Sequence, residues 1–215
     1  MSRALVVTGT DTGIGKTIVA ALLTLMLDAD YWKPIQSGLD GESDSDVVRR
    51  LARATPDRIH PEAYRLNAPL SPHRAAELDG LVIDTARLIP PRTSRPLVIE
   101  GAGGLLVPVT RAELQIDVFA RWRLPVVLVC PTRLGCINHA LLSVEALRSR
   151  DIPIAAIIFA GDENADSQRT IVDFARVPSA GRLPRMTLLD AEHLRNAASQ
   201  HLDMTPLRRT LEASR

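Results

Sequence analysis

Short, nearly continuous runs of apolar residues alternate along the chain with longer segments in which apolar residues recur at helical spacing. The short runs are rich in β-branched residues, which is typical of parallel strands buried on both faces of a sheet. Strands that alternate with helices favour a doubly wound α/β fold, in which helices flank a mainly parallel sheet. The predicted strands are residues 4–8, 31–34, 97–100, 126–130 and 154–159. The predicted helices are residues 16–27, 45–54, 112–121, 137–148 and 167–175.

Two parts of the chain lack this regular alternation. Prolines divide residues 55–95 into short pieces, so we expect a long connection over one edge of the sheet, with a short helix after the turn at residues 69–72. Residues 185–215 are expected to form helices that pack on the sheet. We expect residues 1–215 to form a single domain, because their number suits one full core.

The first strand runs into a glycine-rich turn, T-G-T-D-T-G-I-G-K-T, at residues 8–17. A strand, a glycine-rich turn and a helix in this order predict a phosphate-binding loop and hence a P-loop NTPase-like fold. Lys16 is placed to reach the outer phosphates, and the Thr17 hydroxyl to bind Mg²⁺. Five residues separate Gly9 from Gly15, whereas the strict motif has four, so the loop is either a variant or a chance match.

In a sheet of this kind, the residues directly after each strand gather at one edge and form the site. Lys33 lies on the second predicted strand, and Pro34 and Gly38 predict a loop over residues 34–38. Lys33 has two interpretations: an edge-strand lysine in water, or a second cation that faces the phosphate loop. Asp44 and Asp46 lie near the start of the next helix, where one acid could cap the helix and another could point to a metal. Between them we favour Asp46, because it lies against the apolar start of that helix.

Glu100 ends the third predicted strand and is followed by the glycines of G-A-G-G. A carboxylate at this position can hold Mg²⁺ or its water opposite a phosphate loop, and the glycines let a ligand approach the backbone. Asn138 follows the fourth strand, where helix capping and ligand contact both remain open.

Composition narrows the class of protein. Apolar residues make up 46% and charged residues 24% of the chain, which indicates a globular protein. The net charge of +1 and the aromatic content of 3% give no support to a nucleic-acid or membrane partner. The two cysteines are too few for a disulfide framework. With no signal segment or membrane-spanning run in the sequence, we expect a cytoplasmic location.

Several blocks in this order resemble the dethiobiotin synthetase family, from the first strand to about Pro184. The phosphate loop at residues 8–17 resembles that family's loop, including the extra residue. The other blocks are K-P-x-x-S-G at residues 33–38, S-P-H at 71–73, E-G-A-G-G at 100–104 and L-G-C-I-N-H-A at 134–140. Each block alone is weak, but together they are specific.

The resemblance implies an ATP-dependent cyclo-ligase of biotin biosynthesis. Its substrates would be 7,8-diaminopelargonate, CO₂ or bicarbonate, and ATP, with Mg²⁺ as the cofactor. A carbamate formed on one amine attacks the γ-phosphate, and the second amine then closes the ureido ring, which gives dethiobiotin, ADP and phosphate. The resemblance also implies a homodimer with the substrate site at its interface.

The resemblance also implies roles for individual residues. The implied catalytic residues are Lys16, Lys33, Thr10 and Ser37. The implied nucleotide-binding residues are Asp11, Thr12, Gly13, Ile14, Gly15, Lys16, Thr17, Glu100, Gly103, Arg182, Leu183 and Pro184. The implied metal ligands are Thr17, Asp46 and Glu100, and the implied substrate contacts are Ser37, Gly103, Leu134 and Asn138.

The chain departs from the family pattern after the fifth strand. The family has a base-reading asparagine there, whereas this chain has Phe159, Ala160 and Gly161, and Asn164 comes several residues later. We therefore expect backbone contacts to read the base and the nucleotide selectivity to be loose. The competing hypotheses are a nucleotide-switched partitioning or regulatory ATPase dimer, and a synthetase-like domain without ring closure.

Overall fold

The computed structural model describes residues 3–213, in which strands and helices alternate along the chain. The strands are β1 (Ala4–Gly9), β2 (Asp30–Trp32), β3 (Ile35–Ser37), β4 (Ile59–His60), β5 (Tyr64–Leu66), β6 (Leu97–Gly104), β7 (Val126–Pro131), β8 (Ile154–Ala160) and β9 (Ser179–Leu183). The α-helices are α1 (Lys16–Met26), α2 (Asp44–Ala52), α3 (Pro72–Leu78), α4 (Gln115–Trp122), α5 (Cys136–Arg148), α6 (Ala165–Ala175), α7 (Ala191–His201) and α8 (Thr205–Ala213). Two short 3₁₀ helices, η1 (Pro56–Arg58) and η2 (Thr85–Arg87), lie in the long connection.

The main sheet has seven strands in the order β4-β2-β6-β1-β7-β8-β9. Each neighbouring pair runs parallel, so the carboxyl ends of the strands share one edge. Strand β1 lies in the middle, and the chain returns to the two sides of it with β6 and β7. The segment that follows β1 therefore lies at the point where the strand order reverses, which is where open α/β sheets bind their ligands.

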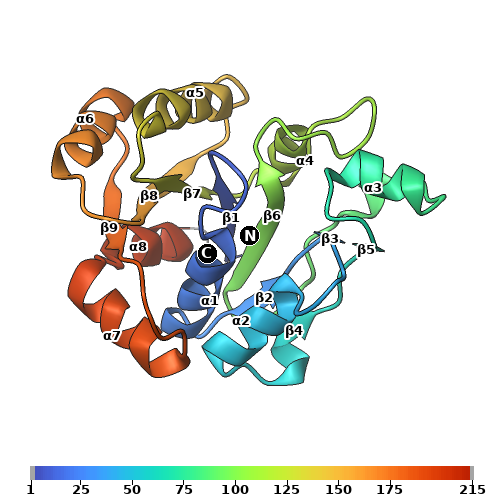
Figure 1. Ribbon diagram of the computed structural model, residues 1–215, viewed down its shortest axis with the longest axis horizontal. Helices are drawn as coiled ribbons and strands as arrows, with labels where there is room; N and C mark the ends of the chain where they lie inside the picture. The colour runs from blue at the N-terminus through green and yellow to red at the C-terminus, as the bar shows by residue number, and fades with distance from the viewer. Residues whose placement is uncertain (1–2, 214–215) are drawn as a thin grey trace.

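Helices cover both faces of this sheet (Figure 1). On one face, α1, α2, α7 and α8 bury their apolar residues against the sheet in the largest core cluster. On the other face, α4, α5 and α6 close two further clusters. Because both faces are covered, the strands are apolar along most of their length, as the sequence pattern predicts.

The predicted fold class is confirmed, and most predicted elements recur. The five predicted strands correspond to β1, β2, β6, β7 and β8, although β6 continues to Gly104. The predicted helices correspond to α1, α2, α4, α5 and α6, with ends shifted by a few residues. The short helix expected after the turn at residues 69–72 is α3. The tail forms α7 and α8, which pack on the sheet as expected, while residues 214–215 lie outside the described residues.

Four short strands do not follow from the sequence pattern. The prediction of a loop over residues 34–38 is wrong at Ile35–Ser37, because this segment pairs with Tyr64–Leu66 to form the separate sheet β3-β5. Strand β4 is only two residues long and adds an edge to the main sheet. Strand β9 contains Gly181 and Arg182. Each of these strands depends on a partner that is distant in sequence, so no local run of apolar residues marks it.

No helix within residues 3–213 is long and apolar enough to cross a membrane.

Candidate functional site

The phosphate loop joins the end of β1 to the start of α1. Gly13 and Gly15 have positive φ angles of 69° and 93°, which glycine adopts without strain. Gly15 is the N-cap of α1, and within residues 3–213 no side chain caps this helix end. The first amide groups of α1 are therefore left to face an anion, and the helix dipole adds to their attraction.

The Lys16 side chain spans this loop. Its Nζ donates a hydrogen bond of 2.6 Å to the carbonyl oxygen of Asp11, across the turn. Burial lowers the pKa of Lys16, and the neighbouring Lys33 ammonium lowers it further, against the opposing effect of Glu100. The Asp11 carboxylate forms an ion pair of 2.6 Å with Arg133, which follows β7. Asp11 is thus held through both its backbone carbonyl and its side chain.

Glu100 is the centre of the polar cluster beside the loop. It lies in β6 next to β1 and is only 1% exposed. Its Oε1 accepts hydrogen bonds from Thr17 Oγ1 at 2.9 Å and from Lys33 Nζ at 3.0 Å. Its Oε2 accepts a hydrogen bond from the Tyr31 hydroxyl at 2.8 Å. Burial raises the pKa of Tyr31 well above its ordinary value of 10, and the charge of Glu100 raises it further, so this hydroxyl remains a donor.

Lys33 faces the phosphate loop, so the hypothesis of an edge-strand lysine in water is wrong. The residue directly follows β2 and is 4% exposed. Its Nζ lies 2.5 Å from Asp44 Oδ2 and 3.0 Å from Glu100 Oε1. Burial alone would lower the pKa of Lys33, but the two carboxylates outweigh burial and raise it. A charged lysine is stable at this buried position because its charge is paired.

The structure corrects the choice between the two acids near the start of α2. Asp44 Oδ1 accepts a hydrogen bond of 3.0 Å from Thr17 Oγ1, whereas Asp46 forms a capping box with Ser43 and an ion pair with Arg49. The Asp46 side chain is 43% exposed. Asp44 rather than Asp46 therefore lies with Thr17 and Glu100, and the preference for Asp46 as the metal ligand is withdrawn. Burial raises the pKa of Asp44, but the Lys33 ammonium more than offsets this and the net pKa is lowered.

The oxygens of Thr17, Asp44 and Glu100 suit a hard cation such as Mg²⁺. The Thr17 hydroxyl lies within 3.0 Å of an oxygen from each carboxylate, so the three donors converge. Residues 3–213 hold no cluster of three or more His, Cys, Asp or Glu side chains that could bind a metal by itself. Such a small ligand set fits Mg²⁺, which usually keeps several waters and takes further oxygens from substrate phosphates.

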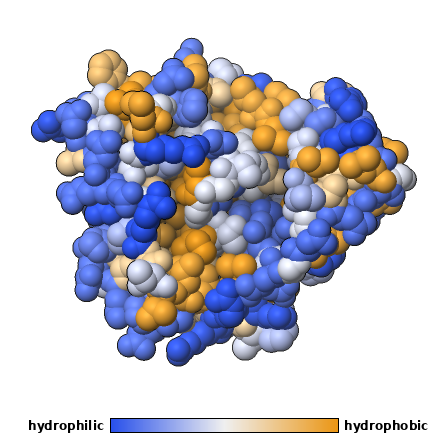
Figure 2. Space-filling model, viewed as in Figure 1, coloured by the Kyte–Doolittle hydropathy of each residue, from blue (hydrophilic) through white to orange (hydrophobic). Residues whose placement is uncertain are grey.

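A cavity of about 670 Å³ opens from this cluster toward β3 and the start of α3. It is lined by Lys16, Thr17, Lys33, Glu100 and Asp44, and it extends past Ser37 and Gly103 to residues 69–72. In the space-filling view, the hollow lies near the centre of the face, beside the projection that carries α3 (Figure 2). The cavity thus joins the charged cluster to a space that can receive a second small molecule.

Three of the predicted catalytic and substrate residues line the walls around the loop. Ser37 Oγ and Thr10 Oγ1 are buried, and among the described residues they have no hydrogen-bond partner. Gly103 has a φ of 70°, and a Cβ at this position would come within 3.0 Å of Val107. Two unpaired hydroxyls and a position that excludes a side chain are features expected where a polar ligand binds.

Tyr31 and Gln36 also belong to this cluster, although neither is among the site residues predicted from the sequence. The Gln36 Oε1 accepts a hydrogen bond from the backbone N–H of Asp44, and its Nε2 donates to the carbonyl oxygens of Ser37 and Gly38. Gln36 therefore links the end of β3 to the start of α2. Only its position between Lys33 and Ser37 could have indicated this role, because its contacts depend on the fold.

A second cavity, of about 350 Å³, lies on the other side of the phosphate loop. Gly13, Ile14, Gly15, Leu183 and Pro184 are among the predicted nucleotide residues that line it. Arg182 is not among its lining residues. Arg182 belongs to β9, and its Nη1 donates a hydrogen bond of 2.9 Å to the carbonyl oxygen of Gly161.

The predicted dimer segment, residues 134–138, spans the turn after β7 and the first residues of α5. A cavity of about 300 Å³ is lined by Thr10, Asp11 and Thr12 together with Leu106 and, from α5, His139 and Leu142; Leu134 and Asn138 do not line it. Leu134 and Asn138 are exposed. The N-cap of α5 is Gly135, so helix capping is not the role of Asn138.

A larger cavity of about 1090 Å³ lies apart from these residues. It is bounded by residues 85–93 and the end of α4, and none of the predicted site residues lines it. The charged cluster, rather than this cavity, therefore marks the candidate site.

Comparisons with known proteins identify the family of the chain. A family model described as an AAA domain matches residues 3–193. The ATP-dependent dethiobiotin synthetase of Rhodopseudomonas palustris strain TIE-1 is 59% identical over 197 residues, which cover 92% of this chain and 93% of that protein. The protein of the same name from Agrobacterium fabrum is 55% identical over 204 residues, covering 95% and 96%.

Solved structures resemble the fold at much lower identity. The cell division complex MinC:MinD of Aquifex aeolicus matches with a TM-score of 0.57 at 15% identity, covering 97% of this chain and 95% of that one. The cell division ATPase MinD of Pyrococcus furiosus matches with a TM-score of 0.55 at 11% identity, covering 93% and 98%. At these identities the likeness shows a shared P-loop ATPase fold and nothing of the activity. The identity with the synthetases over nearly the whole chain is decisive, and the chain belongs to the family of ATP-dependent dethiobiotin synthetases.

Proposed function

We propose that this chain is an ATP-dependent dethiobiotin synthetase that converts 7,8-diaminopelargonate, CO₂ and ATP into dethiobiotin, ADP and phosphate. The observation that carries the proposal is the single cavity in which Lys16 and Thr17 of the phosphate loop meet Lys33, Ser37 and Gly103. A cavity with these walls can hold the outer phosphate of a nucleotide and a small second substrate in contact. Bringing two reactants together in this way supplies a large part of a rate enhancement.

The proposed reaction needs no protein nucleophile. One amine of the substrate adds to CO₂ and loses a proton, which gives a carbamate. A carbamate oxygen attacks the γ-phosphorus, and the bond to ADP breaks. The second amine then attacks the carbonyl carbon, phosphate leaves, and the cyclic urea forms with loss of a second proton.

The chain's own contribution is positioning and charge. The carbamate and the triphosphate are both anionic, so their approach requires concentrated positive charge, which Lys16 and Lys33 would supply. Ser37 and Thr10 would donate hydrogen bonds from their unpaired hydroxyls to the second substrate. Gly103 would let that substrate approach the backbone of the strand end closely.

We propose Thr17, Asp44 and Glu100 as the residues that hold Mg²⁺. Their converging oxygens support this assignment. When bound, the ion would stabilise the negative charge that develops on the phosphoryl oxygens.

We also propose a homodimer in which Leu134 and Asn138 of one chain contact the substrate bound by its partner. Exposed leucines support this proposal: Leu106 and Leu142, each 56% exposed, line the cavity beside Thr10, Asp11 and Thr12, and Leu134 is 102% exposed in the turn before α5. Hydrophobic surface is visible there, over the loop that follows β6 (Figure 2). Large apolar side chains gathered around a polar site are typical of protein–protein interfaces. The cytoplasmic location stays a prediction.

For the nucleotide base, we propose that backbone groups around the 350 Å³ cavity carry the recognition. Asn164 lines this cavity, but its side chain already accepts a hydrogen bond from the N–H of Ser167 and donates to the carbonyl oxygen of Thr132. Among the charged side chains that line it, Arg133 pairs with Asp11 and Arg185 pairs with Asp162, which leaves Glu163. We expect nucleoside triphosphates other than ATP to support the reaction as well.

The competing hypothesis of a nucleotide-switched partitioning ATPase has less support. Proteins of that class usually carry a second lysine near the start of the phosphate loop, where this chain has Thr10, Asp11 and Thr12. The solved structures of that class share the fold at 10–15% identity, whereas the synthetases share more than half of the sequence.

A coupled assay tests the proposal and the base selectivity together. Purified protein is supplied with Mg²⁺, a panel of nucleoside triphosphates, the diamine and bicarbonate, and phosphate release and dethiobiotin are measured. We expect phosphate release to require both the diamine and bicarbonate. Hydrolysis at the full rate without the diamine would contradict the proposal and favour the ATPase hypothesis.

A further inference from the structure

Tyr31 lies behind the candidate metal site and is fully buried. It occupies the middle of β2, opposite Val98 of β6. Tyr31 and Val98 belong to the same core cluster, beneath α1 and α2. Since alternate residues of a strand share a face, Glu100 extends the apolar face of Val98 toward the phosphate loop.

The two oxygens of Glu100 are bound to different parts of the molecule. Oε1 faces the site and accepts hydrogen bonds from Thr17 and Lys33. Oε2 faces the core and accepts its hydrogen bond from the Tyr31 hydroxyl, at 2.8 Å. The tyrosine therefore contacts the carboxylate on the side away from the phosphate loop.

This arrangement bears on the rotation of the carboxylate. The last torsion of a glutamate side chain is broad, so packing of the aliphatic part leaves the direction of the two oxygens open. Lys33 also pairs with Asp44, so Glu100 shares this ammonium with a second carboxylate. The Tyr31 hydroxyl stands on a rigid ring within the core and is a fixed reference for the carboxylate.

We propose that Tyr31 is a positioning residue that sets the rotation of the Glu100 carboxylate, so that Oε1 faces Thr17 and a bound divalent cation. The proposal rests on the metal site assigned under the proposed function and adds a residue to it. Groups that orient a metal ligand from behind commonly change metal affinity by about 10- to 100-fold when they are removed. Tyr31 does not touch the substrates, so its effect passes through Glu100.

Tyr31→Phe tests this role, because it removes one hydroxyl and keeps the ring. The chain offers a matched control, since Tyr64 is its only other tyrosine. Tyr64 is also buried, and its hydroxyl is bonded to the backbone of Asp84, away from the candidate site. Like Tyr31→Phe, Tyr64→Phe should lower the free energy of unfolding through the loss of one buried hydroxyl, but it should not affect Glu100.

The measurement is Mn²⁺ binding to the full chain by electron paramagnetic resonance, with a non-hydrolysable ATP analogue present. It is made at a temperature at which circular dichroism shows both variants to be folded. We expect Tyr31→Phe to weaken Mn²⁺ binding roughly 10-fold and Tyr64→Phe to leave it unchanged. In a Glu100→Gln background, Tyr31→Phe should have little further effect, because the carboxylate that it orients is gone.

Equal Mn²⁺ affinity in the wild type and Tyr31→Phe would overturn the proposal, as would equal losses in Tyr31→Phe and Tyr64→Phe. The test does not depend on ring closure. A protein that binds Mn²⁺ but releases no phosphate in response to the diamine would refute the proposed function, whereas the comparison of the two tyrosines would still decide the role of Tyr31.

Discussion

The Lys33 ammonium lies 3.0 Å from Glu100 Oε1, and both side chains are almost completely buried. Asp44 pairs with the same ammonium from α2. One cation thus joins the end of β2, the middle of β6 and the start of α2 next to the phosphate loop. Burying such an ion pair costs desolvation free energy, and an apolar pair at the same place would pack without that cost. A role of the lysine in binding anions explains why the charges are there.

Lys33→Ala is expected to lower kcat by about 100-fold or more, on the scale observed when one electrostatic donor to a transition state is removed. It also leaves two carboxylates without their shared cation, so we expect the free energy of unfolding to fall by about 3–5 kcal/mol. Steady-state rates at saturating diamine, bicarbonate and ATP measure the first effect, and denaturant unfolding measures the second. An unchanged kcat in folded protein would show that Lys33 does not stabilise the reacting groups.

Asp44→Asn and Asp46→Asn form a matched pair, because the two residues lie in the same helical turn. Asp44→Asn is expected to raise the Mg²⁺ concentration for half-maximal activity at least ~10-fold, since a ligand charge near Thr17 is lost. Asp46→Asn should leave that concentration unchanged and cost only about 1 kcal/mol of stability through its capping box. Magnesium titrations of both variants separate the two roles. A larger rise of the half-maximal Mg²⁺ concentration in Asp46→Asn than in Asp44→Asn would show that Asp46 is the metal ligand.

Glu100→Gln keeps the size of the side chain and removes its charge. We expect a higher Mg²⁺ requirement, because the carboxylate oxygen that faces Thr17 becomes a weaker ligand. The half-saturating Mg²⁺ concentration is the quantity to measure, with the KM for the diamine as the internal control. An unaltered magnesium titration would remove Glu100 from the set of ligands.

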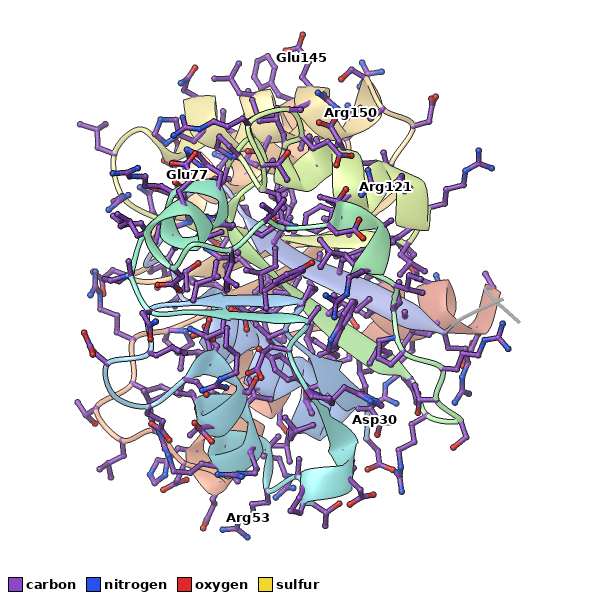
Figure 3. The ribbon with its side chains drawn as sticks, turned by 90° about the vertical axis from the view of Figure 1, so that its right-hand side faces the viewer. Asp30, Arg53, Glu77, Arg121, Glu145 and Arg150 are labelled. Atoms are coloured by element: carbon purple, nitrogen blue, oxygen red, sulfur yellow. The ribbon has the colours of Figure 1, made fainter. Side chains whose placement is uncertain are left out.

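The ion pairs of Glu77 give a prediction about pH. Glu77, labelled on α3 in Figure 3, bonds to Arg111 at 2.6 Å and 2.8 Å and to Arg74 at 3.0 Å. Hydrogen bonds from Arg111 and then Arg74 lower the pKa of this carboxyl from 4.5 to about 2. A lowered pKa in the folded state means that the stabilisation is present above pH 4.5 and is lost as the pH falls toward about 2.

Titration of Glu77 by nuclear magnetic resonance checks this prediction. The expected pKa is well below 4.5 at low salt. Because the pair is exposed, 1 M salt and Arg111→Ala should each bring the pKa back toward the ordinary value. A pKa near 4.5 at low salt would show that Arg111 does not hold α3 to the loop between β6 and α4 in solution.

The sequence by itself determined the class of fold and most positions of the candidate site. Buried parallel strands leave nearly continuous apolar runs, and parallel strands place the residues after them at one edge. The positions of the phosphate loop and Glu100 are therefore identifiable from order and pattern, whereas Lys33 kept two interpretations until its burial and ion pairs were known. Four of the blocks shared with the synthetases, at residues 8–17, 33–38, 100–104 and 134–140, were recognisable for the same reason, since each lies at or after the end of a predicted strand.

Only the tertiary structure decided between Asp44 and Asp46. Two residues apart on a helix, they point about 200° away from each other, so one faces the phosphate loop and the other faces outward. Which of them faces inward depends on where α2 begins, and Ser43 fixes that by taking Asp46 into its capping box. From the sequence alone, Tyr31 likewise cannot be distinguished from the other apolar residues of its strand. Its contact with Glu100 exists because β2 and β6 pair in one particular register, which no local pattern records.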